Sequence, residues 1–218
     1  MIQGQRVREL LESAYEPCSE FCGLCRGIMK WKPENGHIPR GFCGAKGSTD
    51  EVELVLVCAE PGDPHDHESH QGVNSLDYLD SAVSYAYRCF ETGKDPFHRN
   101  IRYILDLCFP EEDFAQQMRR TWITDSVKCS APIECGAVPA EVGRACRAKF
   151  LEKELAFFPN ALVVALGKKA ATRLKGFPGI LEVAAAAPPF GTRKEAKTSW
   201  DAIQTELLKR RSVGAKSL

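Results

Sequence analysis

Four apolar runs rich in β-branched residues, separated by helical patterns, constrain the fold of this chain more than any other feature. The runs are VELVLVCA at 52–59, TWITDSV at 121–127, ALVVAL at 161–166 and ILEVAAA at 180–186. They are nearly continuous rather than alternating, which is typical of parallel strands covered on both faces. Helical patterns begin near 75, 100, 142, 168 and 199. The alternation predicts a three-layer α/β/α sandwich around a mainly parallel four-stranded sheet.

The length and the N-terminal pattern indicate one domain with a loop-rich beginning. A chain of 218 residues with 44% hydrophobic content fits a single domain spanning 1–218. Residues 5–16 have the spacing of a short amphipathic helix. The segment 16–50 carries Gly, Pro and four cysteines without sustained periodicity. We expect a bound ligand to staple this segment to the core.

Charge and hydropathy exclude several classes of protein. The chain has no run of eighteen apolar residues and no apolar signal-peptide core, so we expect a cytoplasmic protein that does not enter a membrane. Lys plus Arg and Asp plus Glu both total 29. Any affinity for nucleic acid must therefore come from local basic stretches.

The ten cysteines indicate metal binding, because the cytosol keeps thiols reduced. Cys22 and Cys25 form a two-spacer pair that can grip one metal centre. Cys129 and Cys146 are candidates for the other half of the site. Four thiolates suit zinc or an iron-sulfur cluster, and spacing does not separate the two.

The other cysteines allow further interpretations. Those at 58, 89 and 108 lie in apolar stretches, where a thiol acts as a small hydrophobic group. Cys18, Cys43 and Cys135 compete for ligand positions. Cys18 completes the C-x3-C-x2-C pattern of radical S-adenosylmethionine enzymes, although four strands are few for such an enzyme. The quartet could also consist of unligated thiols.

Several sequence blocks are similar to iron-sulfur uracil-DNA glycosylases, in matching order. They are VLVCAEPGDP, WITDSVKCSAP, CRAKFLEKEL and ALVVALGKKA, and PFHRNIRYIL resembles a segment before the second strand. The resemblance covers most of residues 20–210. It implies that the quartet of Cys22, Cys25, Cys129 and Cys146 holds a 4Fe-4S cluster, with zinc as the alternative.

The first catalytic motif of that family corresponds to residues 58–62. Glu60 takes the position where relatives carry an Asp or Asn, whereas the iron-sulfur branch usually has its Glu one residue earlier. A carboxylate there suits an oxocarbenium-like reaction. The second strand ends in Asp125, where the family usually has a base-reading Asn. An ionised Asp only accepts hydrogen bonds, so we expect an altered base preference, or weak uracil activity with a raised Asp125 pKa.

The second catalytic motif of the family contains a His that stabilises the departing base, and here the loop at 187–190 reads APPF. The loss of one such donor costs about 3 kcal/mol. His98, His65, His67 or His70 could substitute. The resemblance implies a substrate-binding set of Ala59, Pro61, Gly62, Phe97, His98, Ala187, Pro188 and Phe190.

Phe190 is a candidate wedge that fills the gap left by an extruded nucleotide. Nearby cations suit phosphate contacts. The expected DNA-binding residues are Arg193, Lys194, Lys197 and Lys168.

We therefore expect a monomeric DNA glycosylase-like enzyme that flips a damaged or deaminated base and hydrolyses its N-glycosidic bond, with Glu60 and Asp125 as catalytic residues. A non-catalytic module that binds damaged nucleic acid is the main alternative. A metal-stapled protein that acts on free nucleosides or binds another protein is a third.

Overall fold

The sheet is mainly parallel, as predicted, but it has five strands. The computed structural model describes residues 4–16, 27–70, 72–133 and 135–214. The strand order is β1-β3-β2-β4-β5. The parallel strands are β2 (Leu54–Cys58), β3 (Thr121–Asp125), β4 (Leu162–Leu166) and β5 (Leu181–Val183), and β1 (Cys43–Gly44) runs antiparallel beside β3. The prediction of four strands missed β1, because two residues are too few to give a periodic signal.

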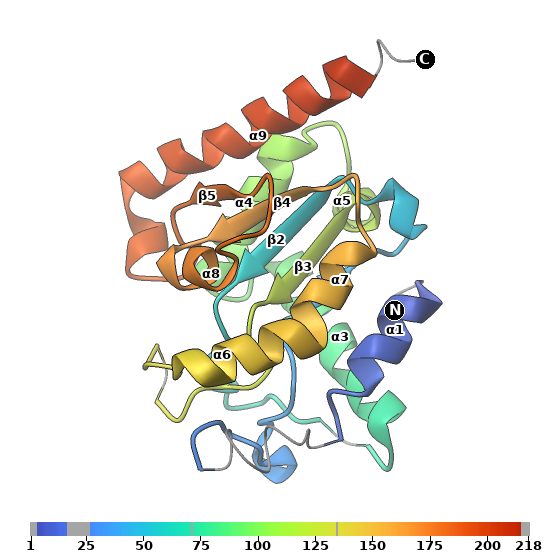
Figure 1. Ribbon diagram of the computed structural model, residues 1–218, viewed down its shortest axis with the longest axis vertical. Helices are drawn as coiled ribbons and strands as arrows, with labels where there is room; N and C mark the ends of the chain where they lie inside the picture. Colours follow the sequence, from blue (N-terminus) through green and yellow to red (C-terminus); the bar gives the residue numbers. More distant parts are fainter. Residues whose placement is uncertain (1–3, 17–26, 71, 134, 215–218) are drawn as a thin grey trace.

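Helices connect the strands in the order that the sequence predicts (Figure 1). They are α1 (Gln5–Glu12), α3 (Ser75–Thr92), α4 (Pro96–Cys108), α5 (Phe114–Arg120), α6 (Ala140–Cys146), α7 (Glu152–Ala156), α8 (Lys168–Arg173) and α9 (Lys194–Gly214). A π-helical turn joins α6 to α7. Helix α5, of seven residues, was not predicted.

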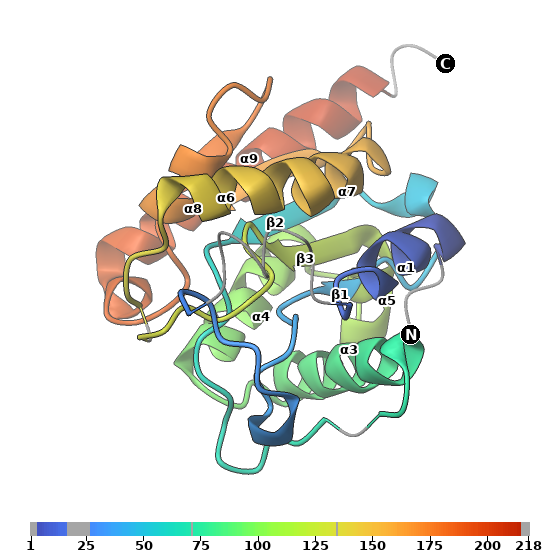
Figure 2. The ribbon, with the colours of Figure 1, turned by 60° about the horizontal axis from the view of Figure 1, so that its bottom comes forward.

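The two faces of the sheet pack against different helices, which gives the predicted three layers. Leu54 and Leu56 of β2 join a core cluster with residues of α4 and α9. Val55 and Val57 point the other way and join a cluster with α7 and α8. In Figure 2, α6, α7 and α8 lie on one side of β2 and β3, and α3 and α4 lie on the other.

The N-terminal segment runs along β3 and the loop that follows it. The backbone N–H groups of Lys30 and Arg40 donate to the carbonyls of Ser130 and Lys128, at 2.8 and 3.2 Å. Further on, the N–H of Ala45 donates to Thr121 O at 2.8 Å. The segment therefore reaches the carboxyl edge of the sheet. Within the described ranges, no helix combines the length and apolarity needed to cross a membrane.

Candidate active site

The loops that follow β2 and β3 lie side by side at the carboxyl edge of the sheet. Cys58 and Asp125 are paired at the ends of the two strands. Beyond them, Ser126 N donates to Cys58 O at 2.9 Å, and Ser130 Oγ donates to Gly62 O at 2.9 Å. The first motif loop and the loop after β3 therefore form one hydrogen-bonded unit at the edge where parallel sheets bind ligands.

The Asp125 carboxyl is buried at this edge, against the backbone of the N-terminal segment. Asp125 is 5% exposed. Gly41 lies directly against it: a Cβ atom on Gly41 would stand 1.7 Å from Asp125 Oδ2, and the φ of +85° favours glycine. A buried carboxyl is stable only when it is neutral or paired, so the group is suited to meet a polar ligand.

Burial raises the pKa of Asp125 to about 8. The charge of Glu60 adds to this increase, whereas Lys128, Arg40 and Arg173 oppose it. Near neutral pH the carboxyl is therefore mostly protonated. It then presents an O–H donor beside a carbonyl acceptor, as an Asn side chain presents N–H beside C=O.

Glu60 is engaged by two cations of α8. Its side chain is 5% exposed, Lys169 Nζ contacts Oε1, and Arg173 NH1 lies 2.6 Å from Oε2. Arg173 NH1 also donates to Ala59 O at 2.7 Å, and Lys169 Nζ to Gly136 O at 2.7 Å. The carboxylate thus ties α8 to the first motif loop, while its buried Oε2 accepts no hydrogen bond among the described residues.

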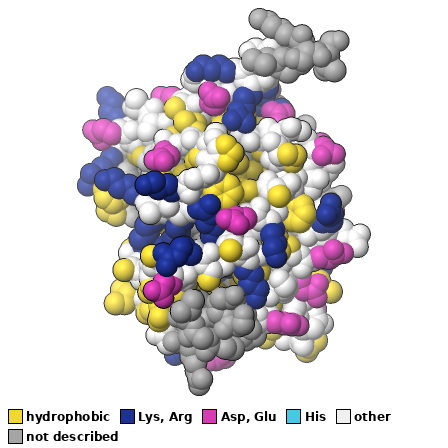
Figure 3. Space-filling view, viewed as in Figure 1, with side chains coloured by type: hydrophobic (Ala, Val, Ile, Leu, Met, Phe, Trp, Pro, Cys, Tyr) yellow, Lys and Arg dark blue, Asp and Glu magenta, His cyan; other side chains and the backbone are white. Residues whose placement is uncertain are grey.

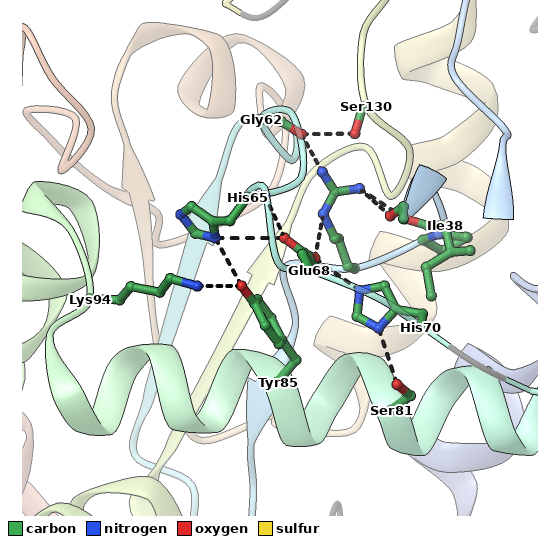
Figure 4. Close-up of polar contacts among 12 residues, drawn as sticks. Ile38, Gly62, His65, Glu68, His70, Ser81, Tyr85, Lys94 and Ser130 are labelled. Carbon is green, nitrogen blue, oxygen red and sulfur yellow. Dashed lines mark hydrogen bonds and ion pairs between the residues drawn. The ribbon is translucent and has the colours of Figure 1, made fainter. Parts of the chain in front are cut away.

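Arg40 joins the N-terminal segment to the same loop. Its Nε lies 3.2 Å from Glu68 Oε1, and its NH2 donates to Gly62 O. Glu68 also accepts from His70 Nε2 at 2.9 Å, and His70 Nδ1 lies 3.2 Å from Ser81 Oγ on α3 (Figure 4). This polar cluster holds the residue that precedes Gly41, and so fixes the backbone that packs on Asp125.

A buried lysine fixes the end of β3. Lys128 Nζ donates to Thr124 Oγ1 at 2.6 Å, to Asp125 O at 2.8 Å and to Glu154 Oε2 at 2.6 Å. The side chains of Lys128 and Glu154 are 1% and 0% exposed. All three ammonium protons are used, so this pair has a structural role in holding the chain beside Asp125.

The loop after β5 reaches the same edge, two strand positions from β2. Asn100 of α4 holds it: Asn100 Nδ2 donates to Ala186 O at 2.8 Å and to Gly191 O at 3.0 Å. Ala187 and Pro188 are exposed. Phe190 is 57% exposed, and the Arg193 guanidinium lies 4.8 Å from its ring centroid. Phe190 is therefore not a core aromatic.

The remaining predicted substrate residues divide between the two loops. Ala59 is half-buried, Pro61 is buried and Gly62 is exposed, all in the loop after β2. Phe97 and His98 lie in the first turn of α4, with ring centroids 5.1 Å apart.

The histidines differ in their freedom to substitute for the missing motif residue. His70 has a side chain with 0% exposure and is held by Glu68 and Ser81. His67 is exposed. His65 and His98 both lie beside Asp95.

The predicted DNA-binding cations lie on the surface. Arg193, Lys194 and Lys197 are exposed around the start of α9, and Lys168 is exposed at the start of α8. Figure 3 shows Lys and Arg side chains gathered over the left and middle of one face, in the region of α8. A chain of zero net charge thus has a locally basic face.

Two of the four predicted cluster ligands lie together. Cys129 and Cys146 are partly buried against a small apolar cluster of Met29, Val127 and Val142. Met29 follows closely after Cys25, but Cys22 and Cys25 lie outside the described residues, as does Cys18. Among the residues that are described, no group of three or more His, Cys, Asp or Glu side chains is arranged to hold a metal ion.

The competing cysteines are arranged differently. Cys43 is 1% exposed in β1, and burial raises its pKa to about 12, so it is a core thiol rather than a ligand. Cys135 is exposed on the loop before α6. Cys58, Cys89 and Cys108 are buried, as predicted for hydrophobic filler.

Sequence reasoning missed Arg40, Gly41, Arg173 and Asp95. The Arg40-Gly41 step lies in a loop without periodicity, and a glycine in a Gly-rich segment carries no signal of what it packs against. Asp95 does carry a signal, because an Asp before Pro96 is typical of a helix N-cap. Its contact with His98 follows from the three-residue spacing on a helix.

Comparison with known proteins does not add to this picture. No known family matches the chain, and no curated protein is similar to it in sequence.

Proposed function

We propose that this protein is a DNA glycosylase-like enzyme of the uracil-DNA glycosylase superfamily, which flips a damaged or deaminated base and hydrolyses its N-glycosidic bond. One observation carries the proposal: the buried Asp125 carboxyl lies at the carboxyl edge of the sheet, where the loop after β2 and the N-terminal segment meet. A flipped base needs such a buried polar group to read its hydrogen-bonding edge.

The protonation state of Asp125 selects the class of base. A neutral carboxyl donates to one atom and accepts from its neighbour, which matches the O4 and N3–H of uracil. The O6 and N1–H of hypoxanthine present the same pattern. An ionised carboxylate would instead favour the amine edge of cytosine. The raised pKa of Asp125 supports the first class, the deaminated bases.

The surface around the site suits DNA. Phe190 is exposed beside Arg193, so an apolar wedge and a phosphate contact are combined in one loop. Lys194, Lys197 and Lys168 extend the positive charge along the starts of α9 and α8.

A metal centre would act as a clamp. Cys22, Cys25, Cys129 and Cys146 would hold a 4Fe-4S cluster, with zinc as the alternative. The position of Cys129 and Cys146 beside Met29 supports this set, because it brings the second half of the quartet next to the chain that follows Cys25. The bound group would join the N-terminal segment to the loop after β3. Iron would give a brown protein whose absorbance at about 400 nm bleaches on reduction, and a colourless zinc protein would contradict it.

A binding module without turnover is the second candidate. The ion pairs of Glu60 favour it, because they hold the carboxylate expected to polarise water against two cations of α8. The absence of His from 187–190 favours it as well.

The test is base release from labelled oligonucleotides that each contain one uracil, hypoxanthine, xanthine or mismatched base. We expect abasic sites with a deaminated base. Tight, salt-sensitive binding of DNA without base release would identify the binding module instead. No binding even at low salt would leave a protein that acts on free nucleosides or binds another protein.

A further inference from the structure

The two carboxyl groups of the candidate site are each constrained by their surroundings. The Glu60 carboxylate is ion-paired with Lys169 and Arg173, although its Oε2 accepts no hydrogen bond among the described residues. Asp125 already holds a proton near neutral pH. Hydrolysis of a glycosidic bond nevertheless needs a base within reach of the attacking water.

His98 has the geometry of an oriented base. It lies in the first turn of α4, where the N-cap residue Asp95 accepts from His98 N at 3.0 Å and contacts His98 Nδ1 at 2.8 Å. Burial alone would raise the pKa of Asp95, but hydrogen bonds from His98 and His65 outweigh it and lower that pKa. Because the ionised Asp95 only accepts, the proton of a neutral His98 ring lies on Nδ1. The lone pair is then on Nε2.

A second imidazole fixes the same carboxylate. His65 Nε2 lies 3.0 Å from Asp95 Oδ2, and His65 Nδ1 lies 3.2 Å from Tyr85 Oη. Lys94 Nζ donates to that hydroxyl at 2.5 Å, so the hydroxyl proton is free to point at His65 (Figure 4). Both nitrogens of His65 are thus engaged. His98 Nε2, in contrast, has no hydrogen bond with the described residues, and 12% of its side chain is exposed.

The position of His98 links the two loops of the site. Its ring centroid is 6.1 Å from that of His65, which follows Gly62 by three residues. Two residues after His98, Asn100 holds the carbonyls of Ala186 and Gly191. The imidazole therefore lies near the loop after β2, in the same turn of α4 that holds the loop after β5 through Asn100.

We propose that His98, oriented by Asp95, is the base that accepts the proton of the attacking water; this assignment rests on the glycosylase function proposed above. The water oxygen bonds to C1′ of the deoxyribose while the C1′–N bond breaks. The bonding electron pair leaves with the base, which accepts a hydrogen bond from the protonated Asp125. The proton of the water moves to His98 Nε2 and is later released to solvent.

The test compares His98→Gln with His67→Gln, a matched change at an exposed histidine. Single-turnover base release is measured with single-stranded oligonucleotides that contain uracil, hypoxanthine or xanthine. We expect His98→Gln to slow release by about 100-fold or more, with unchanged DNA affinity. His67→Gln should match the wild type.

A further variant separates orientation from proton transfer. Asp95→Asn leaves His98 in place. If the Asn oxygen keeps capping His98 N, the Asn NH2 group faces Nδ1 and favours the tautomer with its proton on Nε2, so release should slow. Added imidazole should restore release in His98→Gly but not in Asp95→Asn. Release by His98→Gln at the wild-type rate would overturn the assignment and leave the glycosylase function intact. Loss of DNA affinity in step with the rate would also overturn it. No release by the wild type would overturn both proposals.

Discussion

The substitution Asp125→Asn tests whether this carboxyl is held neutral by the fold. Burial raises its pKa from 3.8 to about 8, so the folded chain keeps a proton that the unfolded chain loses. This group therefore leaves the free energy of unfolding unchanged at a pH below its pKa in the unfolded chain. The free energy of unfolding then falls as the pH rises from that pKa towards 8. The slope is at most about 1.4 kcal/mol per pH unit. By about pH 7 the cost is on the order of 4 kcal/mol.

Asn has the shape of the protonated acid and does not titrate, so the variant should not lose stability as the pH rises. Urea unfolding between about pH 5 and pH 9 measures the free energy of unfolding of both proteins. The free-energy difference between Asp125→Asn and the wild type should grow with pH and become level above about pH 8. Asp66→Asn, at an exposed position, should track the wild type. A difference for Asp125→Asn that stays constant over the whole range would refute the reasoning.

Three other substitutions probe the neighbouring contacts. Glu60→Gln removes the carboxylate that pairs with the Arg173 guanidinium and should lower the free energy of unfolding by about 3 kcal/mol. A change near zero in urea unfolding would contradict the ion pair. Gly41→Ala should destabilise the fold more than Gly176→Ala, because both have positive φ but only the first places a Cβ 1.7 Å from a carboxyl oxygen. Phe190→Ala should change the free energy of unfolding by less than about 0.5 kcal/mol and slow base release from duplex DNA only. Equal slowing on single strands would argue against a wedge.

The strands were predictable because each is a continuous apolar run. The runs at 52–59 and 161–166 contain β2 and β4 almost unchanged. The two-residue β1 is different, because its pairing with β3 depends on tertiary contact rather than on a local pattern. Helix α5 does carry a local signal, because an Asp113 capping box begins it, but the helix is short and ends at the start of β3.

The site was predictable only in part. Glu60 and Asp125 follow from their place after strands, since parallel strands bring their carboxyl ends to one edge. The partner of Glu60 does not follow, because Lys169 is 109 residues away along the chain. Nor does the contact of Gly41 with Asp125 follow, because a glycine shows no preference for what lies beside it. Long-range ion pairs and close backbone contacts therefore required the structure.

The pH profile of uracil release tests the central claim most directly. Because a neutral Asp125 reads the base, single-turnover release from a uracil-containing single strand should fall as the pH rises above about 8. Asp125→Asn should remove that decline. Absence of uracil release by the wild type, or release that stays undiminished up to about pH 10, would contradict the account.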